Sequence, residues 1–258
     1  MKVKDIIKAI EEFAPLSIQE KWDNSGLCIG SESDEVSSVL IGLDCTPELV
    51  DEAVACGADM IVTHHPLIFS GIKSISADNR TGEAVIKAVR AGIAVYSAHT
   101  SADKVIAGVS GAMAARLGLR NVEILDPDGD GTGLGVVGEL PVPMPAEDIA
   151  ALVKDRFSLK VLKSSRPVSG EVKRVAMCGG SGSSLIGKAM ESGAQLYISG
   201  DISYHHFFTE EGFMIMDIGH YESEIDIVEI LFSILRKNFP TFAVRITENI
   251  YSNPIFYY

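Results

Sequence analysis

Apolar runs of strand length alternate with amphipathic runs of helix length over the first hundred residues. Residues 37–44, 59–64 and 93–99 are rich in apolar and β-branched side chains, which is typical of buried strands. Residues 46–57 and 82–92 repeat apolar positions at helical spacing, and each run ends on glycine, the residue that most readily stops a helix. This order predicts an α/β fold with a largely parallel core sheet.

The same order of elements returns in the second half of the chain. Residues 172–180, 195–201 and 213–220 are strand-like, and residues 183–193 are helix-like. Residues 35–65 align without a gap on residues 171–201, with these identical pairs: Glu35/Glu171, Val36/Val172, Val39/Val175, Leu49/Leu185, Ala53/Ala189, Gly57/Gly193 and Ala58/Ala194. The pattern favours an internal duplication over two unrelated α/β units that share common turn residues.

Three further segments have weaker patterns. The glycine-rich stretch 126–135 has the composition of a calcium loop but lacks the glutamate spacing of an EF-hand, so we interpret it as the linker between the halves. Residues 178–184, CGGSGSS, are a tight turn or a phosphate-binding nest. Trp22 is expected in the core with a turn at residues 24–26; a place at the mouth of a site is the alternative.

Composition narrows the class of protein. The chain has 258 residues, 47% of them hydrophobic, and a net charge of −13 without any basic run, which argues against a broad nucleic-acid-binding face. Its four cysteines form no CxxC pair, so a reducing cytoplasm is the expected location. No apolar stretch approaches the ~20 residues of a membrane span, and the acidic, amphipathic residues 1–13 do not resemble a signal peptide.

All six histidines lie at or just after the C-terminal end of a strand-like run. His64 and His65 are adjacent, and Pro66 should end their strand so that both rings reach a common space beyond it. Ligands bind at this carboxyl edge in open α/β sheets. The remaining four are His99, His205, His206 and His220.

Two of these histidines begin the same pattern, His-x-x-x-acid. His99 precedes Asp103 and His220 precedes Glu224, and residues four apart on a helix can meet one object. Repeat symmetry makes His99 the counterpart of His220. Imidazole and carboxylate together suit Zn, Mn or Fe(II). Three histidines and two carboxylates exceed a closed zinc site and suit two ions ~4 Å apart, with Asp103 and Glu224 as bridging ligands.

Six motifs together resemble one family. They are WDNSGLCIG, THHPLIF-x-GIKSI, SAHTSAD, CGGSGSSLI, SGDISYHH and DIGHYESE, which lie in this order along nearly the whole chain. The chain resembles the short form of the Nif-three-like family, whose members are also known as GTP cyclohydrolase type 2 homologues. THHP and GHYESE are the most specific of these motifs.

The resemblance implies a fold and a site. The fold would be two interlinked, internally duplicated α/β domains with mixed sheets and a dinuclear metal site between them. The first would comprise residues 1–126 plus a C-terminal crossover, 228–258, and the second residues 127–227. The ring-shaped assembly of the family would be a homohexamer. The implied metal ligands are His64, His65, Asp103, His220 and Glu224.

Other side chains are expected to support these ligands or to line the site. They are Asp44, Lys73, His99, Asp201, His205 and Glu222. Ligating histidines usually donate their second N–H to an oxygen, which Asp44 or Asp201 could supply unless both only cap helices. Lys73 could hold a substrate phosphate as a point charge. His205 matches the family pattern, whereas His206 departs from it.

Two functions remain open at this point. The first is a metal-dependent hydrolase that opens a purine ring, as a GTP cyclohydrolase does, or cleaves a phosphoester. The partner would then be a nucleotide or another phosphate-bearing small molecule. The alternative is a metal-binding interaction or regulatory protein with little turnover. No motif that reads a base is visible, and the identity of the ions, Zn, Fe or Mn, is not fixed by the ligands.

Overall fold

The computed structural model describes residues 1–248 and 253–257. The chain divides into two compact units, each of which is discontinuous in sequence. Unit 1 comprises residues 1–102 and 227–254, and unit 2 comprises residues 103–226 and 255–258. The chain therefore passes from unit 1 into unit 2, returns to unit 1, and ends with residues assigned to unit 2.

Unit 1 contains a five-stranded mixed sheet. In sheet order its strands are β1 (Gly26–Ile29), β4 (Ala94–Ser97), β3 (Met60–Thr63), β2 (Ser38–Gly42) and β11 (Ala243–Ile246). Every neighbouring pair is parallel except β1 and β4, which are antiparallel. The C-terminal strand β11 thus extends a sheet begun two hundred residues earlier, on the far side of β2.

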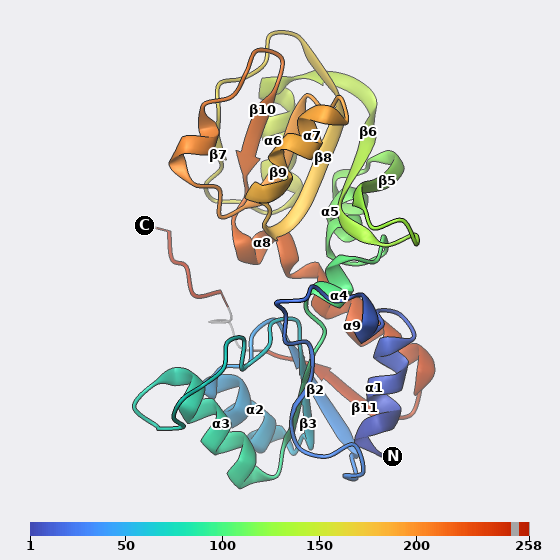
Figure 1. Cartoon of the computed structure of the whole chain (residues 1–258), viewed down its shortest axis with the longest axis vertical. Coiled ribbons are helices and arrows are strands. Elements are labelled where there is room, and N and C mark those ends of the chain that lie inside the picture. Colours follow the sequence, from blue (N-terminus) through green and yellow to red (C-terminus); the bar gives the residue numbers. More distant parts are fainter. Residues whose placement is uncertain (249–252, 258) are drawn as a thin grey trace. The chain divides into compact units, whose positions relative to one another are not determined.

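Helices cover both faces of this sheet, with α2 and α3 on one side and α1 and α9 on the other (Figure 1). Their bounds are α1 (Val3–Glu11), α2 (Pro47–Cys56), α3 (Arg80–Ala91) and α9 (Asp226–Asn238), with a short 3-10 turn, η1, at Leu16–Ile18. Gly57 and Gly92 end α2 and α3 in the left-handed conformation, as the sequence predicts. The apolar faces of α2 and α3 pack on alternate residues of the central strands, such as Leu40 and Ile61.

Unit 2 contains a six-stranded mixed sheet. In sheet order its strands are β5 (Arg120–Pro127), β6 (Gly133–Pro145), β8 (Glu171–Ser181), β9 (Leu196–Gly200), β10 (Met214–Asp217) and β7 (Lys163–Ser164). The central strands β8, β9 and β10 are parallel, and the strands outside them are antiparallel to their neighbours.

Two apolar cores lie on opposite faces of this second sheet. The helices α5 (Val109–Leu117) and α6 (Ala146–Arg156) contribute to one core, and α7 (Ile186–Glu191) contributes to the other (Figure 1). The remaining short elements are α4 (Thr100–Asp103), η2 (Ser183–Leu185), η3 (Tyr204–Phe207) and α8 (His220–Glu224). Of these, α4 and α8 directly follow the strand ends that carry the chemistry described below.

The duplication is visible in the register of the strands. In unit 1 Val39 pairs with Met60, and in unit 2 Val175 pairs with Leu196, so the gapless alignment of the two halves is also an alignment of hydrogen-bonded partners. The next strand follows the same rule. Met60 pairs with Ala94, and its counterpart Leu196 pairs with Met214. Both units therefore share one β-α-β-β core, as the fold class requires.

The stretch 126–135 differs from its interpretation as a linker. It forms the turn between β5 and β6, closed by a bond from the Asp128 amide to the Thr132 carbonyl. The reason is that the residues on either side pair as antiparallel strands. Residues 103–126 therefore belong to unit 2, whereas the sequence analysis assigned them to the first half.

The long strand β8 matches the expected strand 172–180 with one more residue at each end, so it ends at Ser181 inside the CGGSGSS motif. The helical run after it is divided into η2 and α7. Among the described residues, none of the helices has the length and apolar content needed to cross a bilayer. The part of the expected C-terminal crossover at residues 249–252 and 258 lies outside the described residues.

Candidate metal centre

The adjacent histidines follow β3 directly, as the sequence predicts. His64 is fully buried, and its Nδ1 lies 2.9 Å from the carbonyl oxygen of Ala98. His65 is partly exposed, and its Nδ1 lies 2.8 Å from Oδ1 of Asp44. Both acceptors are oxygens, so each Nδ1 carries the proton and donates it. The lone pair of each ring is then on Nε2, the atom that would ligate a metal.

His99 joins this pair within unit 1. It follows β4 and precedes α4, and its Nδ1 donates to Oδ1 of Asp23 at 2.8 Å. One ligand atom from each of His64, His65 and His99 falls within 4.8 Å of the others. The structure therefore gives His99 the geometry of a possible ligand, whereas the family resemblance implies a supporting role.

Asp23 supports His99 and was not among the residues expected from the sequence. Its side chain has no exposed surface, and besides His99 it accepts bonds from the Thr100 amide and hydroxyl and from the Ser25 hydroxyl. Burial alone would raise the pKa of this carboxyl group. The bonds from His99, Thr100 and Ser25 outweigh burial and hold the pKa well below its usual range. The only available signal was its place in the WDNSGL motif.

Replacing Asp23 with alanine should lower the free energy of unfolding by about 2–4 kcal/mol at neutral pH, because several buried donors lose their acceptor. The pKa of Asp23 is depressed in the folded state. This contribution is therefore complete above the unfolded pKa of about 4 and is lost as the pH falls through the folded pKa. Denaturant titrations of both proteins at neutral pH and near pH 3 would measure it.

The matched control is Asp51→Ala, which removes a surface partner of Lys87 and should change stability by less than about 1 kcal/mol. Equal stability losses in the two variants, or a difference between Asp23→Ala and the parent protein that grows as the pH falls, would contradict the account of Asp23.

Unit 2 carries a second set of possible metal ligands just after the end of β10. His220 begins α8, and its Nδ1 donates to Oδ2 of Asp201 at 2.7 Å. Its Nε2 lies 3.0 Å from Oε2 of Glu224, one helical turn later. Glu224 is only 4% exposed. A buried carboxylate is unfavourable unless positive charge compensates it, and a metal ion beside His220 and Glu224 would supply that charge.

The loop that carries Asp201 is held in place by a buried carboxylate. Asp217 accepts bonds from the amides of Ile202 and Gly219 and forms an ion pair with Lys163. These contacts join the turn after β9 to the turn after β10. Asp201 itself has a left-handed backbone, with φ of 51°, so the turn is held in a conformation that a non-glycine residue adopts rarely.

The CGGSGSS motif makes room for Glu224. Gly180 has φ of 60°, and a Cβ added there would lie 2.2 Å from Oε1 of Glu224 and 3.4 Å from the His220 ring. The Gly180 amide donates to the Ser223 hydroxyl at 2.9 Å, which ties this turn to α8. A steric role thus accounts for Gly180 without a phosphate.

Asp103 and Glu224 occupy the same part of unit 2. Burial raises the pKa of the Cys178 thiol to about 12, and the charges of Asp103 and Glu224 add to this effect. Burial, with the two negative charges nearby, keeps this thiol protonated and unreactive. Cys178 therefore acts as an apolar wall beside the carboxylates.

The repeat does not align the two His-x-x-x-acid patterns as expected. Ser97 pairs with Thr63 as Asp217 pairs with Ser199, so the register makes Thr100 the counterpart of His220. His99 then corresponds to Gly219. The alignment of His99 with His220 is wrong by one residue, because α4 follows His99 whereas α8 starts at His220 itself.

The remaining predicted residues differ in their surroundings. The carboxylate of Glu222 folds over Gly219, close to the Tyr257 hydroxyl. His205 lies on η3, where its ring contacts Tyr204. Lys73 is exposed in the segment between β3 and α3, and His206 is exposed beside His205. The roles assigned to Lys73, His205 and Glu222 stay predictions.

The position of Trp22 differs from the one expected from the sequence. The residue is 60% exposed, so its assignment to the core is wrong. The physical reason is the inward turn of its neighbour Asp23 toward His99, which leaves Trp22 pointing outward. Its ring instead contacts the rings of Phe69 and His99.

Asp44 does not cap the helix that follows it, because Thr46 is the N-cap of α2. Replacing Asp44 with alanine should weaken metal affinity about 10- to 100-fold, since the Nδ1 proton of His65 loses its acceptor. Competition with a chelating dye would measure the change, with Asp51→Ala as the control. Unchanged affinity in Asp44→Ala would show that this carboxylate does not support a ligand.

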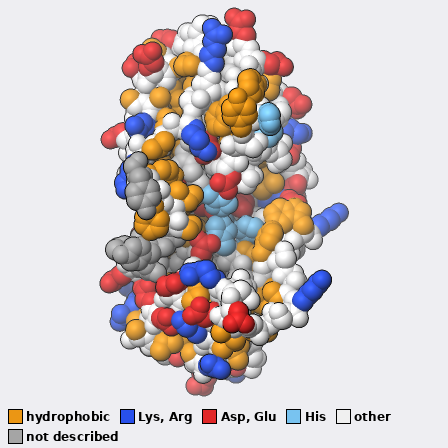
Figure 2. Space-filling model, turned by 90° about the vertical axis from the view of Figure 1, so that its left-hand side faces the viewer, with side chains coloured by type: hydrophobic (Ala, Val, Ile, Leu, Met, Phe, Trp, Pro, Cys, Tyr) orange, Lys and Arg blue, Asp and Glu red, His pale blue; other side chains and the backbone are white. Residues whose placement is uncertain are grey.

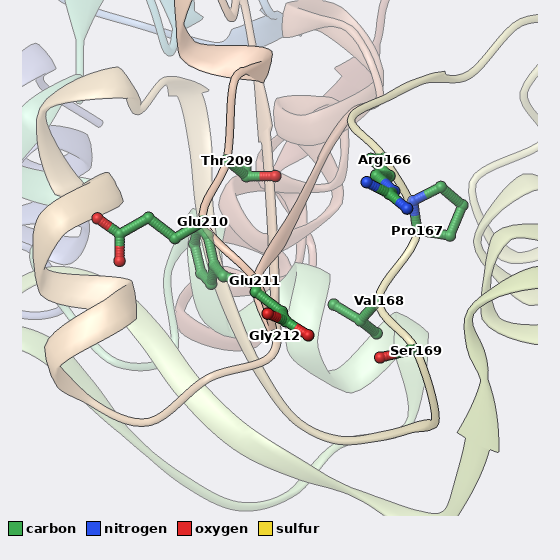
Figure 3. A pocket seen from close by; sticks show the side chains of 9 residues that line it. Arg166, Pro167, Val168, Ser169, Thr209, Glu210, Glu211 and Gly212 are labelled. Carbon is green, nitrogen blue, oxygen red and sulfur yellow. The ribbon is translucent and has the colours of Figure 1, made fainter.

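A hollow of about 220 Å³ lies beside His65 in unit 1. It is bordered by the start of α2 and the start of α3, and its lining includes Asp44, Thr46, His65 and Arg80. A pocket of about 290 Å³ in unit 2 is lined by residues 166–169 and 209–213 (Figure 3). It precedes β10, whereas His220 follows that strand, so it is separate from the candidate centre.

The comparisons with known proteins agree with these features. A model of the family described as Duf34/NIF3 (NGG1p interacting factor 3) matches residues 1–254. A Clostridium perfringens protein named GTP cyclohydrolase 1 type 2 homolog is 37% identical over 228 residues, 87% of each chain.

Solved structures resemble the whole chain. A hypothetical protein of Staphylococcus aureus is 29% identical with a TM-score of 0.90, covering 100% of this chain and 99% of that one. A Bacillus cereus protein related to NIF3 has the same TM-score and coverage at 23% identity, which supports the fold alone. With the motifs and the duplicated units, these matches show that the chain belongs to the DUF34/NIF3 family.

Proposed function

We propose that this chain is a metal-dependent hydrolase that holds two divalent ions through His64, His65, Asp103, His220 and Glu224. One observation carries the proposal. His64, His65, His99 and His220 all donate from Nδ1 to an oxygen and so present Nε2 as the ligand atom. Histidines that bind metals are held by this kind of bond, and surface histidines have no need of it.

The donor set fits divalent transition metals. Imidazole nitrogens and carboxylate oxygens suit Zn, Mn or Fe(II), and this ligand type does not rank the three. Burial favours the same reading, because His64 is 0% and Glu224 4% exposed. Five donors exceed the four of a closed zinc site, which supports two ions over one.

When bound, such ions act as Lewis acids and make water nucleophilic at neutral pH. The protein's own contribution is positioning. Asp44 and Asp201 fix the rings of His65 and His220, and Asp23 fixes that of His99. The hollow beside His65 leaves space for a reacting group next to a ligand, which supports an enzyme over a purely structural metal site.

The relatives' names support a substrate class. They are called GTP cyclohydrolase 1 type 2 homologs, which supports a nucleotide, opened at its purine ring, or another phosphoester. Both reactions need an activated water and differ in the substrate contacts. Lys73 would contribute a charge for a phosphate group.

A panel of nucleotides and phosphoesters incubated with metal-loaded protein tests the proposal. We expect turnover of one substrate class that disappears in Asp103→Ala and persists in Asp51→Ala. Lys73→Ala should raise KM for phosphate-bearing substrates with little change in kcat. No turnover across the panel by a protein that carries both ions would favour the alternative, a metal-bearing interaction protein, which the description "NGG1p interacting factor 3" supports.

The expected hexamer remains a prediction. Closed rings are a common arrangement of soluble homo-oligomers, and an acidic surface charge keeps such an assembly in solution. Mass photometry at micromolar concentration should give about six times the chain mass of 27.6 kDa. A monomer under these conditions would contradict the hexamer and leave the metal proposal standing.

A further inference from the structure

Two large aromatic side chains lie exposed beside the imidazoles of unit 1. Trp22 is 60% and Phe69 50% exposed, and their ring centroids are 5.9 Å apart at an interplanar angle of 67°. Both rings also contact His99 edge-on, at 6.2 Å from Trp22 and 5.9 Å from Phe69. The face drawn in Figure 2 has hydrophobic side chains next to histidine side chains.

The segments that carry the two rings are fastened to each other. The side-chain amide of Asn24 donates to the carbonyl of Ile68 at 2.6 Å, which links the residues just after Trp22 to the residue just before Phe69. The buried carboxylate of Asp23, which lies between Trp22 and Asn24, fixes the same segment through its bond from His99. Specific bonds therefore fix the segments that carry the two rings, and both rings are exposed at these positions.

We infer that Trp22 and Phe69 form a binding site for a planar nitrogen heterocycle of the nucleobase type. The ring planes are inclined at 67° and both side chains are at least half exposed, so a flat ligand can stack on the face of one ring while its edge meets the other. Stacking of a base on an aromatic side chain is sequence-tolerant and strong. It would also explain how a base is recognised without any sequence motif that reads its edges.

A small ligand fits this pair better than a protein partner. Both rings contact His99, whose ligand atom lies within 4.8 Å of those of His64 and His65. A heterocycle on the pair would therefore lie beside metal-binding imidazoles, where its reactive atoms are needed. The inference rests on the proposed function only for the use made of the bound ring, since stacking itself requires no metal.

The test uses the emission of Trp22, the only tryptophan in the chain. Guanosine 5′-monophosphate should quench it saturably, in metal-loaded and in chelator-treated full-length protein alike. Ribose 5-phosphate, which lacks the ring, should not. Phe69→Ala should weaken binding of the nucleotide about 5- to 150-fold. Phe69→Leu should weaken it comparably, because leucine keeps apolar bulk and loses the aromatic face.

Val89→Ala is the matched control, because Val89 is equally exposed on α3 and lies outside the pair. Its affinity should equal that of the parent protein. Trp22→Ala, measured by calorimetry, should bind as weakly as Phe69→Ala. Thermal melting would verify that each variant is folded.

Three results would overturn the inference. They are the absence of quenching by the nucleotide at millimolar concentration, equal quenching by ribose 5-phosphate, and unchanged affinity in Phe69→Ala. A Phe69→Ala protein that changes its oligomeric state yet binds the nucleotide normally would identify the pair as a protein interface instead. Metal analysis of the same samples separates these outcomes from a failure of the metal proposal.

Discussion

Replacing Asp103 with alanine is expected to lower metal affinity roughly a hundredfold or more and to abolish turnover. In the proposed centre Asp103 would be a ligand shared by both ions, so its loss would affect the whole centre, whereas loss of a supporting carboxylate such as Asp44 should cost about 10- to 100-fold. Elemental analysis after gel filtration should give two ions per chain for the parent protein and fewer than one for the variant.

Asp126→Ala provides the control for Asp103→Ala. Asp126 is a partly exposed carboxylate of the same unit that pairs with Lys188 at 3.2 Å. Its removal should leave the metal content unchanged and alter stability by less than about 1 kcal/mol. A full metal complement in Asp103→Ala would remove this residue from the ligand set.

The substitution Gly180→Ala should also remove metal from the proposed centre. The added Cβ would lie 2.2 Å from Oε1 of Glu224, so the carboxylate must leave its position or the turn must move. We expect metal affinity to fall at least tenfold, together with a stability loss of about 1–2 kcal/mol from the left-handed backbone. Elemental analysis and denaturant titration would measure the two effects separately.

Gly193→Ala separates the steric effect from the backbone effect. Gly193 has φ of 76°, and a Cβ there would meet no atom within 4 Å. It should therefore lose similar stability and keep its metal. Equal metal content in both glycine variants would show that Gly180 does not shape the site.

Much of the fold was predictable because local chemistry and tertiary structure agree. Gly57 and Gly92 were predicted to end their helices, and both do so in the left-handed conformation that glycine adopts easily. The gapless alignment of the two halves also matches residues that occupy equivalent positions in the paired strands. The hairpin of β5 and β6 was missed for a physical reason. Its glycine-rich turn has the composition of a linker, and only the pairing of the strands on either side distinguishes the two.

The candidate site was predictable only as far as strand order allows. Residues at the carboxyl ends of parallel strands lie at one edge of the sheet. Histidines at these strand ends were therefore enough to predict a metal site there. The partner of His99 could not be found in this way, because Asp23 lies 76 residues away and outside the repeat. The one-residue offset between His99 and His220 likewise depends on where each helix begins, which sequence patterns locate poorly.

Anomalous diffraction from crystals of the metal-loaded protein tests the central claim most directly. The account predicts two peaks per chain within about 4 Å of each other, ligated by His64, His65, Asp103, His220 and Glu224. A single ion held by other residues, or no anomalous peak at these side chains in protein supplied with Zn, Mn and Fe, would contradict it.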